Sequence, residues 1–137
     1  MKLNLSNLTH IFHLQNEGLK ETIQEGWRDK KVRYFVLSST IINILGWAVS
    51  IFLNFRIDEE VIPLHHNIYF GISLIGSPKQ IYFIPLLGLI LILINLIFSY
   101  LVKQKDNFFV YLFTASSILI NFFLLLGLGS IILINFR

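Results

Sequence analysis

The sequence predicts an all-α membrane protein with three transmembrane helices, an amphipathic N-terminal helix and a short extended external segment. Residues 34–55, 81–102 and 108–135 form three apolar runs without Asp, Glu, Lys, Arg or His. The first two runs have 22 residues each, about 33 Å as a helix, which matches a hydrocarbon core about 30 Å thick. Because a chain in lipid must satisfy its own backbone hydrogen bonds, each run is expected to be a helix.

Composition favours one small membrane domain without catalytic machinery. The chain has 137 residues, 55% of them apolar, and no cysteine. The lack of cysteine excludes a disulfide framework, a thiolate metal site and a cysteine nucleophile. The sequence also contains no phosphate-binding glycine loop and no GxSxG, HExxH or CxxC motif. We therefore expect a non-enzymatic protein without a cofactor.

The polar segment at residues 1–33 precedes the first span. Its apolar side chains recur at spacings of three, four or seven residues, which places them on one stripe of a helix. This helix either lies on the inner membrane surface or packs against a protein partner, and the pattern leaves both alternatives open. The stripe comprises Leu5, Leu8, Phe12, Leu19, Ile23 and Trp27.

The distribution of basic residues predicts the orientation of the chain. Six precede the first span, whereas the connection at residues 56–80 and the turn at residues 103–107 contain two each. Because basic residues near span ends favour the cytoplasmic side, we expect the N-terminus and the short turn inside, with residues 56–80 and the C-terminus outside. This topology explains the basic cluster, so no nucleic acid partner is expected. The six are Lys2, Lys20, Arg28, Lys30, Lys31 and Arg33.

The external connection at residues 56–80 has a pattern of its own. Apolar and polar residues alternate from Ile62 to Leu74, with only His66 out of step, which indicates an extended strand. A helical stripe is the alternative, but the β-branched residues and the glycines favour the strand. A strand places Leu64, Ile68, Phe70 and Ile72 on a protected face, and His65, Asn67, Tyr69 and Ser73 on the opposite, wetter face.

His65 and His66, with the acidic residues at 58–60, are the cluster that most resembles a metal site. Imidazole and carboxylate ligands suit Zn²⁺. Neighbouring residues on a strand, however, point to opposite faces, and Pro63 separates the acidic residues from the histidines. We therefore expect a water-facing polar pair and no metal site.

Polar residues inside the spans are the candidate helix–helix contacts. Asn43 and Asn121 lie near the midpoints of their spans, and Asn95 lies about 5 Å towards the inner side in the second span. Ser116 and Ser117 occupy the same inner half. Asn and Ser commonly join helices in membranes through hydrogen bonds. A polar path for a small solute is the alternative, but no ionisable residue lies within the spans.

The external segment also carries a resemblance. The stretch from Ile62 to Ile72, followed by Leu74, Ile75 and Gly76, resembles a PLHxNIYFG-like motif in uncharacterised small bacterial integral membrane proteins. In those proteins, as here, the motif lies between a first span and an Ile/Leu-rich pair of spans. The second histidine departs from the family pattern, which has an aromatic residue there. The resemblance implies a bacterial cytoplasmic membrane location and no known activity.

These patterns favour a protein that acts by association in the lipid bilayer, through homo-oligomer formation or as an accessory subunit. The small residues at 127–130, other than Leu128, offer a surface for close helix approach, although they lack the GxxxG spacing. A subunit of an oligomeric transporter or channel is the alternative. A membrane enzyme that uses His65 and His66 ranks third.

The topology is testable by labelling from opposite sides of the membrane. Cysteines introduced at Ser77 and Gln104 lie in the external connection and the internal turn. In intact cells a membrane-impermeant thiol reagent is expected to label the first and not the second, because the basic residues hold the turn inside. Labelling of both from one side contradicts the three-span topology.

Overall fold

The structure, a computed structural model, describes residues 27–57, 60–67, 69, 71–103 and 106–136. The predicted N-terminal stripe, except Trp27, lies outside these residues. The elements follow in the order α2 (Lys30–Arg56), β1 (Ile62–Asn67), β2 (Gly71–Gly76), a 3₁₀ helix η1 (Pro78–Tyr82), α3 (Phe83–Val102) and α4 (Asn107–Asn135).

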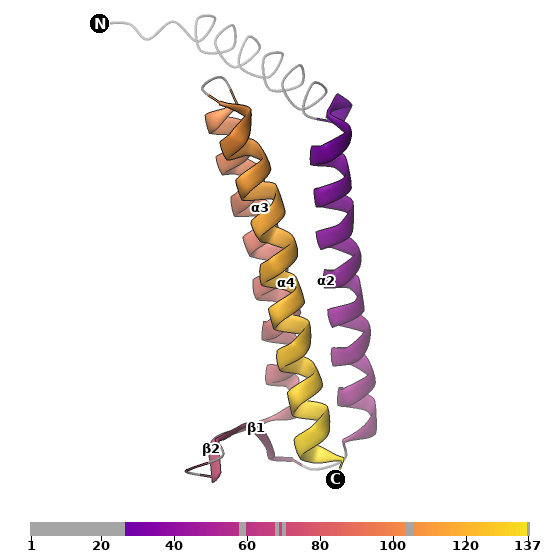
Figure 1. Cartoon of the computed structure of the whole chain (residues 1–137). Coiled ribbons are helices and arrows are strands. Elements are labelled where there is room, and N and C mark those ends of the chain that lie inside the picture. The colour runs from indigo at the N-terminus through magenta and orange to yellow at the C-terminus, as the bar shows by residue number, and fades with distance from the viewer. Residues whose placement is uncertain (1–26, 58–59, 68, 70, 104–105, 137) are drawn as a thin grey trace, which may run out of the picture.

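Three helices are long and apolar enough to cross a membrane, and they pack side by side as one bundle (Figure 1). This confirms the predicted helical three-span fold class. α4 packs against both α2 and α3. The start of α2, the end of α3 and the start of α4 share one end of the bundle, which we call the basic end (Figure 1). The two strands and the last residues of α4 share the other, which we call the hairpin end.

α2 and α4 begin before their apolar runs because a polar side chain caps the start of each helix. α2 begins at Lys30, four residues before the first apolar run, and the Asp29 carboxylate accepts a hydrogen bond from the Lys31 amide at 2.8 Å. Asp106 caps α4 in the same way, accepting from the Phe108 amide at 2.9 Å. A side-chain oxygen at this position satisfies an amide that has no partner within the helix.

Most residues of the buried seam between the helices are small or polar, whereas the outer surface of the bundle is apolar. Large side chains such as Ile44, Phe98 and Phe123 face outwards. Buried residues recur mainly every three or four positions, as in left-handed helix packing. They include Ser39, Asn43, Gly46, Ser50 and Leu53 in α2, Pro85, Gly88, Ile92 and Ser99 in α3, and Val110, Thr114, Ser117, Asn121, Leu128 and Ile131 in α4.

The segment between α2 and α3 is extended, as predicted, but it folds into a hairpin instead of one continuous strand. β1 and β2 pair antiparallel, with Asn67 opposite Gly71. Gly71 has a φ of 73°, a left-handed conformation that a short hairpin connection requires and that glycine adopts without strain. Gly71, which the sequence pattern indicates as a strand breaker, therefore allows the chain to reverse direction between the two strands.

The predicted single protected face is wrong because the strand register shifts twice. The pairing is irregular between Pro63 and His65 and again between His65 and His66, and each irregularity breaks the period-two alternation. Ile62 is buried and Leu64 half-buried, but Ile72 is 54% exposed. His65 and Tyr69 are exposed, as expected. Ile68 and Phe70, and the side chains of Asn67 and Ser73, lie outside the described part.

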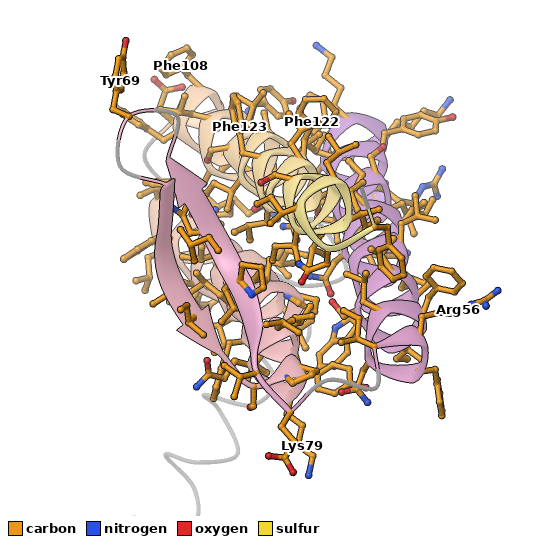
Figure 2. The ribbon with its side chains drawn as sticks, turned by 90° about the horizontal axis from the view of Figure 1, so that it is seen from below. Arg56, Tyr69, Lys79, Phe108, Phe122 and Phe123 are labelled. Carbon is orange, nitrogen blue, oxygen red and sulfur yellow. The ribbon has the colours of Figure 1, made fainter. Side chains whose placement is uncertain are left out.

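An apolar cluster joins the hairpin to α2, η1 and α4. Ile62 of β1 is fully buried among residues of α2, η1 and α4. The Asn135 side chain at the end of α4 also donates a hydrogen bond to the Pro63 carbonyl at 3.0 Å. In the view from the hairpin end, Arg56, Tyr69 and Lys79 point away from the bundle (Figure 2). The cluster consists of Leu53, Ile62, Ile81, Leu128 and Ile131.

Two isoleucines in the hairpin provide a matched test of this packing. Ile62→Ala leaves a cavity beneath β1 and is expected to lower the free energy of unfolding by about 2–4 kcal/mol. Ile72→Ala removes a side chain that is 54% exposed and is expected to change it by less than about 0.5 kcal/mol. Denaturation in mixed micelles measures both. Equal losses contradict the hairpin packing.

Candidate functional site

Two buried asparagines join all three helices at the centre of the bundle. The Asn43 side-chain amide of α2 donates to the Asn121 side-chain oxygen of α4 at 2.9 Å. The same Asn43 nitrogen donates to the Pro85 carbonyl of α3 at 2.8 Å. Asn121 in turn donates to the Gly88 carbonyl of α3 at 3.4 Å and to the Ser117 carbonyl of its own helix at 2.9 Å. We call this set the asparagine layer.

Glycine at position 88 gives the asparagine layer its space. A Cβ atom built at Gly88 meets the side-chain amides of both Asn43 and Asn121. On α2, Gly46 lies opposite Pro85 and Leu128, and a Cβ there would be 3.6 Å from each. Small residues thus let the backbones approach closely enough for short amide side chains to bridge them. Neither glycine was identified from the sequence, although each lies near the level of the asparagines.

Further polar contacts between α3 and α4 lie about one to three turns closer to the basic end. The Asn95 side chain of α3 donates to the Ser117 hydroxyl of α4 at 3.0 Å, and the Ser99 hydroxyl donates to the Val110 carbonyl at 3.3 Å. Ser116 differs from the prediction. Its hydroxyl donates to the Leu112 and Phe113 carbonyls of its own helix and bonds to no other helix that the structure describes.

The asparagine layer lies at the middle of the membrane-crossing part. Asn43 follows Arg33 by 10 residues and precedes Arg56 by 13, or about 15 and 20 Å along a helix. Asn43 and Asn121 are 5% and 3% exposed. A buried amide far from water depends on partners within the protein, because an unpaired one costs about 1–3 kcal/mol. The geometry therefore suits a structural junction between helices.

One buried polar group differs from the others. The Ser50 side chain is fully buried, and its hydroxyl has no hydrogen-bond partner among the described residues. It lies on the α2 seam one turn beyond Gly46, between the asparagine layer and the apolar cluster of the hairpin end. The polar part of the seam therefore ends at Ser50.

At the basic end, a charged contact joins α2 to α4. The Tyr111 hydroxyl donates to the Asp29 carboxylate at 2.7 Å, and the Lys31 ammonium lies 5.3 Å from the centre of the Tyr111 ring. The hydrogen bond from Tyr111, with smaller contributions from the Lys31 and Val32 amides and the Lys31 charge, holds the pKa of Asp29 below its ordinary value of 3.8 despite some desolvation. The sequence did not reveal this contact, because the two residues are 82 positions apart.

The histidine pair shows no metal-binding arrangement in the described part of the chain. His65 is exposed on β1, and the side chain of His66 lies outside that part. No group of three His, Cys, Asp or Glu residues within the described ranges is placed to hold a metal ion. In the middle of the bundle the structure instead brings together amides and hydroxyls, which form hydrogen bonds between helices.

A double-mutant cycle measures the coupling in the asparagine layer. Asn43→Leu and Asn121→Leu are each expected to lower the free energy of unfolding in mixed micelles by about 0.5–2 kcal/mol. Because the two side chains share one hydrogen bond, the double variant is expected to lose less than the sum of the single losses. Additive losses mean that the two amides do not interact.

Ser50→Ala is the matched control for removal of a buried polar group. Since its hydroxyl has no partner in the described structure, the substitution is expected to leave stability unchanged or to raise it slightly. A loss comparable to that of Asn43→Leu would reveal a hydrogen bond at Ser50.

Acid is expected to weaken the contact between Asp29 and Tyr111. Because the pKa of Asp29 is lowered in the folded protein, the stabilisation is complete above the ordinary value of 3.8 and is lost as the pH falls through the folded pKa. Carbon-13 NMR of the Asp29 carboxyl group measures that pKa. Tyr111→Phe is expected to raise it towards its ordinary value, and an unchanged pKa contradicts the contact.

Comparison with known protein families, curated proteins and solved structures found no match to this chain. The resemblance of residues 62–76 to small bacterial membrane proteins therefore stays a prediction. The structural conclusion is that this chain is a membrane-embedded bundle of three apolar helices joined by buried amides and hydroxyls.

Proposed function

We propose that this chain is a non-enzymatic membrane protein that acts by associating with other membrane helices. The observation that carries the proposal is a small-residue notch on the outward side of α4. Gly127 and Ser130 are exposed there, and a Cβ atom at Gly127 would meet nothing within 4 Å. Large side chains flank the notch, with Phe123 66% and Leu126 53% exposed. Phe123 points away from the other helices (Figure 2).

The chemistry of the notch suits another helix better than lipid. Small residues allow a second backbone to approach closely, which favours helix association where lipid supplies no hydrophobic driving force. The Ser130 hydroxyl makes no hydrogen bond within the described ranges, whereas the Ser116 and Thr114 hydroxyls bond to their own helix. A neighbouring helix offers Ser130 a partner that acyl chains do not.

The hydrogen bonds of the buried polar residues favour association over solute transport. The side chains of Asn43, Asn95 and Asn121 bond to other groups within the bundle. A transport path needs polar groups that face a solute or water. The central amides instead support a self-contained bundle with an outward surface for contact.

The proposal places the protein in a bacterial cytoplasmic membrane, with the basic end in the cytoplasm and the hairpin outside. The six basic residues that precede the first apolar run support this orientation. The partner is either a second copy of this chain or a larger membrane protein that it accompanies.

Energy transfer between labelled copies in lipid vesicles tests the proposal. The wild-type chain is expected to show transfer that rises with the protein-to-lipid ratio. Gly127→Leu and Ser130→Leu fill the notch and are expected to weaken association about tenfold, because small residues at membrane helix interfaces set the distance of approach. Ala48→Leu, which enlarges an exposed small residue on α2, is the matched control and is expected to keep the wild-type behaviour.

The outcomes separate the two kinds of partner. Loss of transfer in the notch variants but not in Ala48→Leu supports self-association through α4. The alternative outcome is a monomeric wild-type chain that co-purifies with another membrane protein in mild detergent. If the Ser130→Leu variant no longer co-purifies with that protein, the result supports an accessory subunit. A monomeric chain that retains nothing contradicts the proposal.

A further inference from the structure

Basic side chains surround the lipid-facing side of the first turn of α2. Within that turn Val32 is 7% exposed and faces the bundle. Successive residues are about 100° apart around a helix, so Lys31 and Arg33 lie on either side of Val32, and Lys30 lies nearly opposite it. Arg28 is exposed just before the turn. We call Arg28, Lys30, Lys31 and Arg33 the basic collar.

The two described carboxylates at this end of the bundle balance at most half of the four positive charges of the basic collar. Asp29 and Asp106 are the carboxylates that the structure describes at this end of the bundle. Asp29 accepts hydrogen bonds from the Lys31 amide and the Tyr111 hydroxyl, and Asp106 accepts from the Phe108 amide. Because the Asp29 carboxylate already occupies the start of α2, the side chains of the basic collar are what attract an anion here.

The depth of the basic collar matches the level of lipid headgroups. Trp27 and Tyr34, on either side of it in the sequence, are 50% and 63% exposed, and aromatic side chains of this kind favour the membrane–water interface. Arg33 and Arg56 are 23 residues apart, about 35 Å along a helix, which is close to the hydrocarbon thickness of about 30 Å. The collar therefore lies just outside the hydrocarbon, where phosphate groups lie.

We propose that the basic collar binds the phosphate groups of acidic phospholipids. Arginine forms paired hydrogen bonds with phosphate oxygens, and lysine adds a compact charge. Each basic residue close to an anionic membrane surface favours binding by roughly fivefold. The collar residues lie in the first turn of α2 and just before it, so binding of this lipid class does not depend on association through α4.

Quenching of Trp27 fluorescence by brominated lipids tests the proposal. Trp27 adjoins the collar, and Trp47→Phe removes the other tryptophan. This variant is reconstituted in vesicles that contain equal amounts of phosphatidylglycerol and phosphatidylcholine, with bromine on the acyl chains of one or the other. Both leaflets contain acidic lipid, so orientation does not affect the result. We expect about fivefold preferential binding of phosphatidylglycerol beside Trp27.

Two charge variants locate the preference. Lys30→Gln combined with Arg33→Gln removes half of the collar and leaves the Lys31–Tyr111 contact in place. In that variant the preference for phosphatidylglycerol is expected to fall well below that of the chain with an intact collar, because two of the four cations remain. Arg56→Gln combined with Lys79→Gln removes two cations from the hairpin end and is expected to keep the full preference. Circular dichroism checks that each variant retains its helices.

Salt and free phosphate separate lipid binding from simpler anion attraction. Raising the salt concentration from about 0.1 M to 1 M shortens the Debye screening length from about 10 Å to 3 Å. This change is expected to remove most of the preference for phosphatidylglycerol. Inorganic phosphate at constant ionic strength is expected to have no effect, and competition by it would assign the collar to free phosphate instead. Equal quenching by both lipids in the chain with an intact collar, or an unchanged preference after Lys30→Gln and Arg33→Gln, overturns the proposal.

Discussion

Hydrocarbon offers no hydrogen-bond partners, and this constraint determines how the three helices fit together. The amides of Asn43 and Asn121, about midway through the spans, are satisfied by each other and by the carbonyls of α3. Since these bonds require all three helices at one level, they fix the depth at which the helices meet. Gly88 makes the arrangement possible because any side chain there would occupy the space of the two amides.

The two ends of the bundle are closed by different chemistry. At the hairpin end, Ile62 lies under β1 within an apolar cluster, and Asn135 holds the hairpin to α4. At the basic end, Asp29 joins α2 to Tyr111 of α4. Each contact joins segments far apart in the sequence. The central amides, the apolar cluster and the charged contact together restrain the helices at three levels, and the outward face of α4 stays open.

The spans follow from the sequence because three charge-free runs have the length of a hydrocarbon core. Asn43 and Asn121 are expected at the same depth in the membrane, because each residue of a helix adds a fixed rise along the helix axis. The rotation of each helix about its own axis is harder to predict from the sequence. Ser116 and Ser117 are neighbours, but only Ser117 bonds to another helix. Which of the two does so depends on where the partner helix lies. The hairpin was missed because Gly71 reverses the chain and two register shifts break the alternation around His65. The roles of Gly88 and Asp29 depend on residues distant in sequence.

The most direct test of the asparagine layer is the stability of Gly88→Ala in mixed micelles. The added methyl group displaces the amides of Asn43 and Asn121, so unfolding is expected to become easier by about 1–3 kcal/mol. Gly129→Ala is the matched control, since a Cβ atom there meets nothing within 4 Å; it is expected to be neutral or slightly stabilising. If Gly88→Ala is as stable as Gly129→Ala, the helices do not meet through the two asparagines.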